Sequence, residues 1–241
     1  MFANLLPGFR HFRTPFAVGT IVAFEWWVIV GDLIPKPSQA HGFLQRLYSL
    51  AEFAGRPLVT AAIGFTLYLV GNAMTLKSWQ AMRLVHALSR VLPAPTISAE
   101  STGQLLQIVR KAFEKRGASD IAQIRQVVRE MQAELIDIRM HLTANHVEVY
   151  LEHDRLDSEA EFRFNIAVHL VNVWCVLAVV WSPWFIAGFV LTAILYHDAV
   201  IALREANAIL VQSVVSGIVT SRVYEREIQR DREYDASADA A

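Results

Sequence analysis

The sequence lacks most features that mark a soluble enzyme. Among its 241 residues there is one cysteine, Cys175, so no disulfide can form within the chain. No GxGxxG, GxxxxGK, GxSxG or CxxC motif occurs, which removes the common signatures of nucleotide binding, nucleophilic serine and redox chemistry. The formal net charge is −1, so no overall basic field favours nucleic acid. We therefore expect no cofactor, no nucleic-acid partner and no enzymatic activity.

Lys and Arg are absent from residues 164–203, where two apolar runs, 164–181 and 184–203, meet at Ser182 and Pro183. Each run is long enough to cross the roughly 30 Å hydrocarbon layer of a bilayer at about 1.5 Å per residue. Trp181 and Trp184 flank the turn, as interfacial aromatic residues do. The pattern predicts a transmembrane helical hairpin.

Two more apolar stretches precede this hairpin. Residues 14–34 end at Pro35, which cannot continue a helix, and residues 57–76 open with Pro57 and contain small residues that permit close helix approach. Residues 1–13 have the pattern of a helix on the membrane surface, and residues 38–56 that of an interfacial helix on the outer face. The bilayer is thus the expected surrounding of residues 1–76.

The distribution of charge predicts the topology. Residues 77–163 contain twelve of the 22 Lys and Arg residues, whereas the loop before residue 57 contains three. By the positive-inside tendency we expect both termini and this segment to be cytoplasmic, and the protein to lie in the cell membrane. The expected fold is all-α, with four transmembrane helices and a helical, partly coiled-coil cytoplasmic domain. The expected parts are residues 1–76, 77–163, 164–203 and a cytoplasmic extension, 204–241, with a disordered end.

The soluble part contains one clear heptad pattern, which begins after Ser119. Apolar residues occupy the a and d positions for three heptads, followed by Leu at the next a position and Asn145 at the next d position. This seam favours assembly with another copy or packing within the same domain, and the pattern leaves both open. Its members are Ile121, Ile124, Val128, Met131, Leu135, Ile138 and Leu142. For residues 206–221, which lack charge but are rich in Ser and Thr, we expect a buried helix packed on this one.

Polar side chains inside the predicted spans are the candidate functional residues, because polar groups in lipid are costly and usually face protein or water. In the hairpin, His169 is predicted at the level of His197. The ion-path candidates are Glu25, Asp32, Asn72, His169, Asn172, His197 and Asp198. The set suggests either an ion path or interhelical hydrogen bonds that fix packing. His141, His146 and His153 lie among acidic residues spread over several helix faces, so we expect no metal site.

Glu25 is the most informative of these residues. It lies near the middle of the first predicted span, which contains no Lys or Arg. A carboxylate at that depth must be protonated, paired with another subunit or in contact with water. The adjacent Trp26 and Trp27 also allow a membrane boundary closer to Glu25, which lowers this cost.

The first functional hypothesis is a homo-oligomer that forms or gates an ion or proton conduit, with cytoplasmic helices for assembly or regulation. The alternative is a non-conducting membrane-anchored scaffold whose cytoplasmic helices bind a protein partner. A membrane-embedded metal-dependent enzyme is a third reading. The arrangement of two spans, a cytoplasmic segment, a hairpin and a tail is similar in topology to flagellar-stator-type proton-channel subunits. No functional residue is carried over from that similarity.

Overall fold

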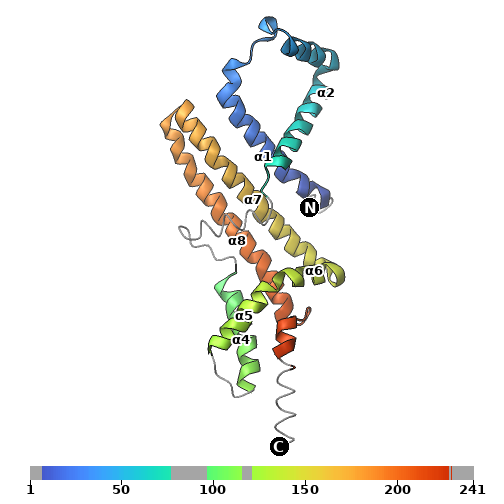
Figure 1. The fold of residues 1–241 in the computed structure, drawn as a ribbon, viewed down its shortest axis with the longest axis vertical. Coiled ribbons are helices and arrows are strands. Elements are labelled where there is room, and N and C mark those ends of the chain that lie inside the picture. Colours follow the sequence, from blue (N-terminus) through green and yellow to red (C-terminus); the bar gives the residue numbers. More distant parts are fainter. Residues whose placement is uncertain (1–6, 77–96, 116–120, 228, 230–241) are drawn as a thin grey trace, which may run out of the picture. The chain divides into compact units, whose positions relative to one another are not determined.

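The computed structural model describes residues 7–76, 97–115, 121–227 and 229, and this part of the chain contains helices and no strand (Figure 1). The chain divides into two compact units, one formed by Met1–Leu92 with Ser158–Ala199 (unit 1) and one by Pro93–Asp157 with Val200–Ala241 (unit 2). The elements in chain order are α1 (Pro7–Val30), η2 (Gly31–Leu33), η3 (Pro37–Gln39), α2 (Phe43–Met74), α4 (Ala99–Lys115), α5 (Ile121–Ala133), α6 (Leu135–Asn145), α7 (Val147–Val180), η4 (Pro183–Ala187) and α8 (Gly188–Val215).

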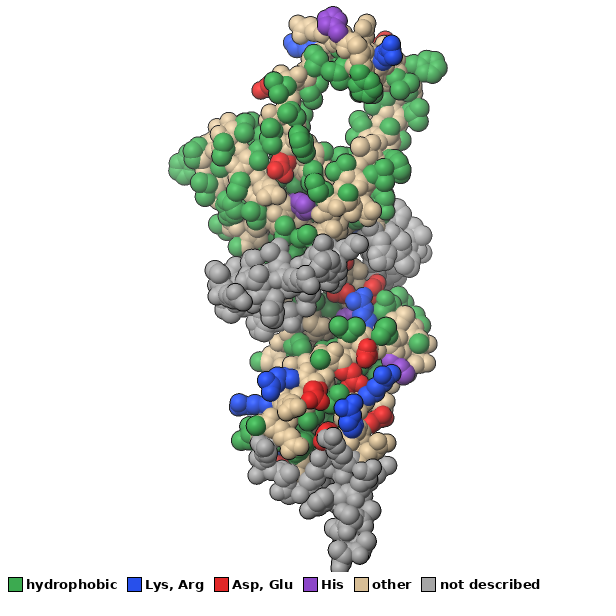
Figure 2. Space-filling model, in the orientation of Figure 1, with side chains coloured by type: hydrophobic (Ala, Val, Ile, Leu, Met, Phe, Trp, Pro, Cys, Tyr) green, Lys and Arg blue, Asp and Glu red, His purple; other side chains and the backbone are tan. Residues whose placement is uncertain are grey.

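Four helical segments are long and apolar enough to cross a membrane, namely Phe12–Leu33, Phe43–Met74, Val147–Val180 and Pro183–Val215. This confirms the predicted all-α class and the four spans. Hydrophobic side chains cover most of the visible face of unit 1, whereas Lys, Arg, Asp and Glu gather on unit 2 (Figure 2). Unit 1 is therefore the membrane-type part of the chain.

The helix boundaries differ from the sequence prediction at the N-terminal end. Residues 7–13, expected to belong to a separate surface helix, are the start of α1, which continues through Pro15 to Val30. The predicted interfacial helix and second span are both part of α2, which is kinked at Gly55 (φ 76°). Only glycine adopts this backbone conformation readily, so the kink has a local cause. Residues 77–96, the first part of the expected cytoplasmic segment, lie outside the described part.

Helices α1 and α2 cross with their backbones in contact at two glycines. A Cβ atom on Gly71 would overlap the carbonyl oxygen of Pro15, and one on Gly19 would overlap that of Leu67. Beside the crossing, the rings of Phe12 and Tyr68 stack with centroids 4.8 Å apart. Gly71 was among the small residues expected to permit close approach, and the crossing shows which of them is used.

The hairpin between α7 and α8 is organised around Trp174. Its indole Nε1 donates a hydrogen bond to Thr192 Oγ1 at 3.1 Å, and its ring stacks on Phe185 with centroids 6.5 Å apart. Gly188 lies directly against the indole face, where any side chain would collide. The second apolar run of the hairpin, 184–203, opens with a 3-10 turn, η4, which begins at Pro183, and α8 starts at Gly188.

The core of unit 2 contains the predicted heptad seam. Six of the seven seam residues are buried together with α4 and the C-terminal part of α8, and Ile121 alone is exposed, at 65%. The seam therefore packs within its own unit. The α8 residues in this core include Leu210 and Val211, as expected for a buried helix after residue 206, although α8 ends at Val215.

The heptad region is also interrupted, because α5 ends at Ala133 and α6 begins at Leu135. Between them, the Glu134 carboxylate accepts hydrogen bonds from Ser221 Oγ at 2.6 Å and from the backbone N–H of Arg222 at 2.7 Å. These groups begin a short helix over residues 222–227. A capping bond of this kind satisfies N–H groups that have no partner inside the helix.

Candidate functional site

The structure brings two of the predicted polar residues together in unit 1. Glu25, in the last two turns of α1, lies within electrostatic range of His169 of α7, and these two side chains form no hydrogen bond or ion pair with each other. His169 Nε2 lies 3.3 Å from the backbone oxygen of Met74, at the end of α2. With Nε2 donating to this carbonyl, Nδ1 remains available to accept a proton. His169 thus joins α7 to the end of α2, with the Glu25 carboxyl of α1 within electrostatic range.

The end of α2 is fixed one turn away by Asn165, which is fully buried on α7. Its Oδ1 accepts a hydrogen bond from Leu76 N at 2.7 Å, and its Nδ2 donates to Leu76 O at 3.3 Å and to Glu161 O at 2.9 Å. One amide therefore pairs with both backbone groups of a residue just past the helix end. This arrangement positions the Met74 carbonyl that His169 contacts.

A charged contact holds α1 against α7 at a second level. Arg13 donates to Glu159 Oε2 at 2.9 Å and lies 4.0 Å from the centroid of the Phe162 ring. Arg163, one turn along α7, donates to the other oxygen of Glu159 at 3.0 Å. The Glu159 carboxylate therefore accepts hydrogen bonds from arginines of both helices.

These two contacts give the relative direction of α1 and α7. Arg13 precedes Glu25 along α1, and Glu159 precedes His169 along α7, so the two helices run in the same direction past one another. The separation along each helix is similar, roughly 15–18 Å at about 1.5 Å per residue. Glu25 and His169 are therefore held in register by a contact about three turns away.

The other ion-path candidates lie apart from this pair. Asp32 is exposed in η2, and Asn72 and Asn172 are exposed on α2 and α7. On α8, the His197 side chain is 72% exposed, with Nδ1 3.7 Å from Oδ1 of Asp198. Matching depths along a hairpin places residues at one height but does not say which helix face carries them, so His197 and His169 do not join.

The histidines of unit 2 form no cluster. His153 is buried, and its Nδ1 lies 3.0 Å from the backbone oxygen of Ala206, a contact that ties α7 to α8. Within the residues that the structure describes, no group of three or more His, Cys, Asp or Glu side chains is placed to hold a metal ion.

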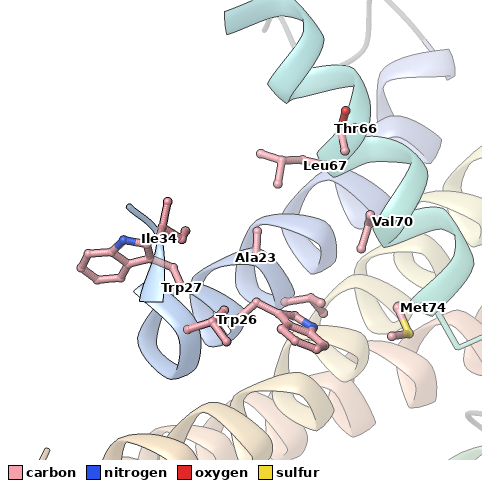
Figure 3. A pocket seen from close by; sticks show the side chains of 10 residues that line it. Ala23, Trp26, Trp27, Ile34, Thr66, Leu67, Val70 and Met74 are labelled. Carbon is pink, nitrogen blue, oxygen red and sulfur yellow. The ribbon is translucent and has the colours of Figure 1, made fainter. Parts of the chain in front are cut away.

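A cavity of about 400 Å³ lies between α1 and α2, on the side of their crossing that leads to η2 (Figure 3). Its walls are apolar or aromatic apart from Thr66, whose hydroxyl already donates to Ala62 O at 2.8 Å. The lining residues are Val22, Ala23, Trp26, Trp27, Val30, Ile34, Thr66, Leu67, Val70 and Met74.

Comparison with known proteins adds no relative, since no family model, no curated protein and no solved structure matches this chain. The described part of the chain defines a class only: an all-helical protein with four helices suited to a membrane. Sequence reasoning selected Glu25 and His169 but missed Asn165 and Gly19. Asn165 carried a usable signal, because it lies one helical turn before His169.

Proposed function

We propose that this protein is a homo-oligomer that forms or gates a path for ions or protons through the membrane, with Glu25 and His169 as its titratable centre. The observation that supports the proposal is that a carboxyl and an imidazole from separate helices of the apolar unit lie within electrostatic range of each other, with His169 Nε2 3.3 Å from the Met74 carbonyl oxygen. An imidazole titrates near neutral pH, and a carboxylate is a second group that binds or releases protons.

The cost of placing this pair in an apolar unit supports the functional reading. A carboxylate at the centre of a membrane helix costs up to roughly 3 kcal/mol. No Lys or Arg occurs in residues 14–34, 57–76 or 164–203, so no cationic side chain within the spans offsets that cost. Interhelical packing needs no ionisable group, because amides and hydroxyls provide the same hydrogen bonds.

The exposed polar residues support an oligomer. Asn72, Asn172 and His197 lie on the outer surface of the spans of a single chain. Lipid tails cannot satisfy these groups, whereas the polar surface of a second copy or a water-filled path between copies can. The path is therefore proposed between subunits, where it reaches these side chains.

For the topology we propose cytoplasmic termini in a cell-membrane protein. In a Cys175→Ala background, Ser49→Cys and Ser182→Cys should react with an impermeant maleimide added to intact cells. Ser119→Cys and Ser237→Cys should react only after the cells are opened. Labelling of Ser119→Cys from outside would reverse the orientation.

The functional test is flux in liposomes containing the purified full chain. We expect proton or cation flux from the wild type, and reduced flux or an altered pH dependence from Glu25→Gln and His169→Gln. Stability of Glu25→Gln should hold or rise, because the change removes a costly charge and keeps the shape. Cys175→Ala, an exposed change on α7, is the matched control. Wild-type flux equal to that of empty liposomes contradicts the proposal.

One observation favours the alternative, a non-conducting scaffold that binds a cytoplasmic protein partner. Four apolar side chains of α6 and α7 in unit 2 are exposed: Ile136 (74%), Met140 (63%), Val147 (53%) and Leu151 (46%). Exposed apolar residues grouped on neighbouring turns are typical of protein interfaces. If the protein is a scaffold, the double variant Ile136→Asp, Met140→Asp should lose partner binding. If the protein is a conduit, the same double variant should leave liposome flux unaffected.

A further inference from the structure

We propose that the cavity between α1 and α2 is a binding site for one acyl chain of a membrane phospholipid. This site is separate from the Glu25 and His169 pair and does not depend on its function. Figure 3 shows Ala23 of α1 and Leu67 of α2 on facing walls, with the Trp26 and Trp27 indoles farther along α1. In Figure 2 the space-filling surface is open between the two helices.

The cavity is fixed at both ends by contacts within unit 1. At one end, Gly19 and Gly71 bring the two backbones together, so the helices cannot slide into the space without breaking this crossing. At the other end, the connection between the helices is held by a hydrogen bond from Tyr48 Oη to Pro35 O at 3.0 Å. The helices therefore diverge from a fixed crossing and border a preformed space that is open to the surface.

Water is a poor occupant of this space. A buried water molecule needs two to four polar partners, and an apolar cavity of about 150 Å³ stays dry. The polar side-chain groups of the lining are the two indole N–H groups and the Thr66 hydroxyl, and this hydroxyl already donates its proton to Ala62 O. An unfilled void would forfeit the dispersion contacts of its lining. The chemistry of the walls requires an apolar occupant.

The volume of the cavity distinguishes between two possible apolar occupants, a lipid acyl chain and a helix of a second copy. A helix has a diameter of about 10–12 Å and a pitch of about 5.4 Å, so about 400 Å³ accommodates roughly one turn. A cavity of about 150 Å³ holds benzene, which has six carbon atoms. On that scale the cavity of about 400 Å³ between α1 and α2 holds on the order of sixteen carbon atoms, the length of one lipid acyl chain. The volume therefore fits a chain and not a transmembrane helix.

The rim of the cavity indicates that its occupant comes from the surrounding lipid. Trp26 and Trp27 are 60% and 57% exposed, and Ile34 and Met74 at the edges are about half exposed, so the space opens onto the surface that the spans present to their surroundings. In a bilayer these surroundings are lipid tails. The two indole N–H groups have no acceptor among the described residues and are available to the ester carbonyls of the same lipid, as interfacial tryptophans commonly are.

The test is the lipid retained by the full chain purified in detergent and measured by native mass spectrometry after incubation with palmitoyl-oleoyl phosphatidylcholine. Ala23→Trp and Val70→Trp fill the cavity from opposite walls, and Ala61→Trp places the same side chain on an exposed position of α2 outside the lining. We expect about one phospholipid per chain for the wild type and Ala61→Trp, and at least a fivefold loss for the two filled variants.

Folding is monitored by circular dichroism and size-exclusion chromatography. Folded Ala23→Trp and Val70→Trp proteins that retain as much phospholipid as the wild type would overturn the proposal. If both variants misfold, titration of delipidated wild type with the same lipid decides the question. A melting temperature that rises and saturates near one lipid per chain supports the site, and no rise or a rise without saturation overturns it.

Discussion

Replacement of Gly71 by alanine tests the crossing of α1 and α2 directly. The added Cβ would lie 2.6 Å from both the carbonyl carbon of Pro15 and the backbone nitrogen of Gly19. Carbon atoms pack without repulsion at about 3.5–4.0 Å, so the two helices must separate by about 1 Å or more. Both contacting groups are backbone, and neither can rotate away as a side chain would.

The expected magnitude follows from this geometry. Overpacking a tight contact costs about 1–3 kcal/mol, and an obstacle made of backbone places Gly71→Ala at the upper end, about 3 kcal/mol. Alanine also favours the helix over glycine by about 1 kcal/mol, which leaves a net loss of about 2 kcal/mol. For a chain of this size the loss corresponds to a fall in melting temperature of about 4–8 °C.

Gly64→Ala is the matched control on the same helix. Its Cβ would meet only the edge of the Phe16 ring, at 4.0 Å, which is an ordinary contact. We therefore expect an unchanged or slightly higher melting temperature, measured by circular dichroism in one detergent for wild type and both variants. If Gly71→Ala melts together with Gly64→Ala, the close backbone crossing is not present in the protein.

Three further predictions concern contacts away from the crossing. Asn165→Leu should lower stability by about 2–4 kcal/mol, because it leaves the N–H and C=O of Leu76 without their partner. The control Asn172→Leu, at an exposed site, should not lower stability, and equal melting temperatures for the two variants would refute the pairing of Asn165 with Leu76. Leu135→Asp should unfold unit 2, and Ile136→Asp, at a position 74% exposed, should have little effect on the helical circular dichroism signal. Because Arg13 and Arg163 both donate to the Glu159 carboxylate, Glu159→Gln should weaken this contact between α1 and α7 and lower the melting temperature. The loss should be at most about 1 kcal/mol, since the ion pair is partly exposed, and a melting temperature equal to that of the wild type would show that the contact adds nothing to stability.

Particular residues show how far the sequence could predict this structure. Runs without Lys or Arg were sufficient for the four spans, because a membrane helix must satisfy its own backbone and carry an apolar surface. The heptad pattern marked a face that is buried from Ile124 to Leu142, although Ile121 at its start is exposed. Periodicity identifies which side of a helix is covered and not which chain covers it, so packing within unit 2 required the structure.

The candidate site shows a different limit. Glu25 and His169 could be selected individually, since ionisable groups are rare in apolar spans. Their pairing could not, because His169 also matched His197 in depth and only the rotation of each helix decides between the two. The spacing of Asn165, one helical turn before His169, places the two on the same side of α7, but its partner is the backbone of Leu76, and no side-chain pattern reports a contact with a backbone group 89 residues away.

The discontinuity of unit 2 has a consequence for protein synthesis. Its core combines residues from α4, α5 and α6 with Leu210, Val211 and Val219, and all of α7 and the first twenty or so residues of α8 are translated between these two sets. A nascent chain is made in order from its N-terminus, so the apolar faces of α4 to α6 remain uncovered until both helices of the hairpin have left the ribosome. Membrane insertion of the hairpin therefore begins before this unit can close. A ribosome that stalls before residue 206 would leave an inserted protein with an open core, which is a substrate for chaperones and membrane proteases.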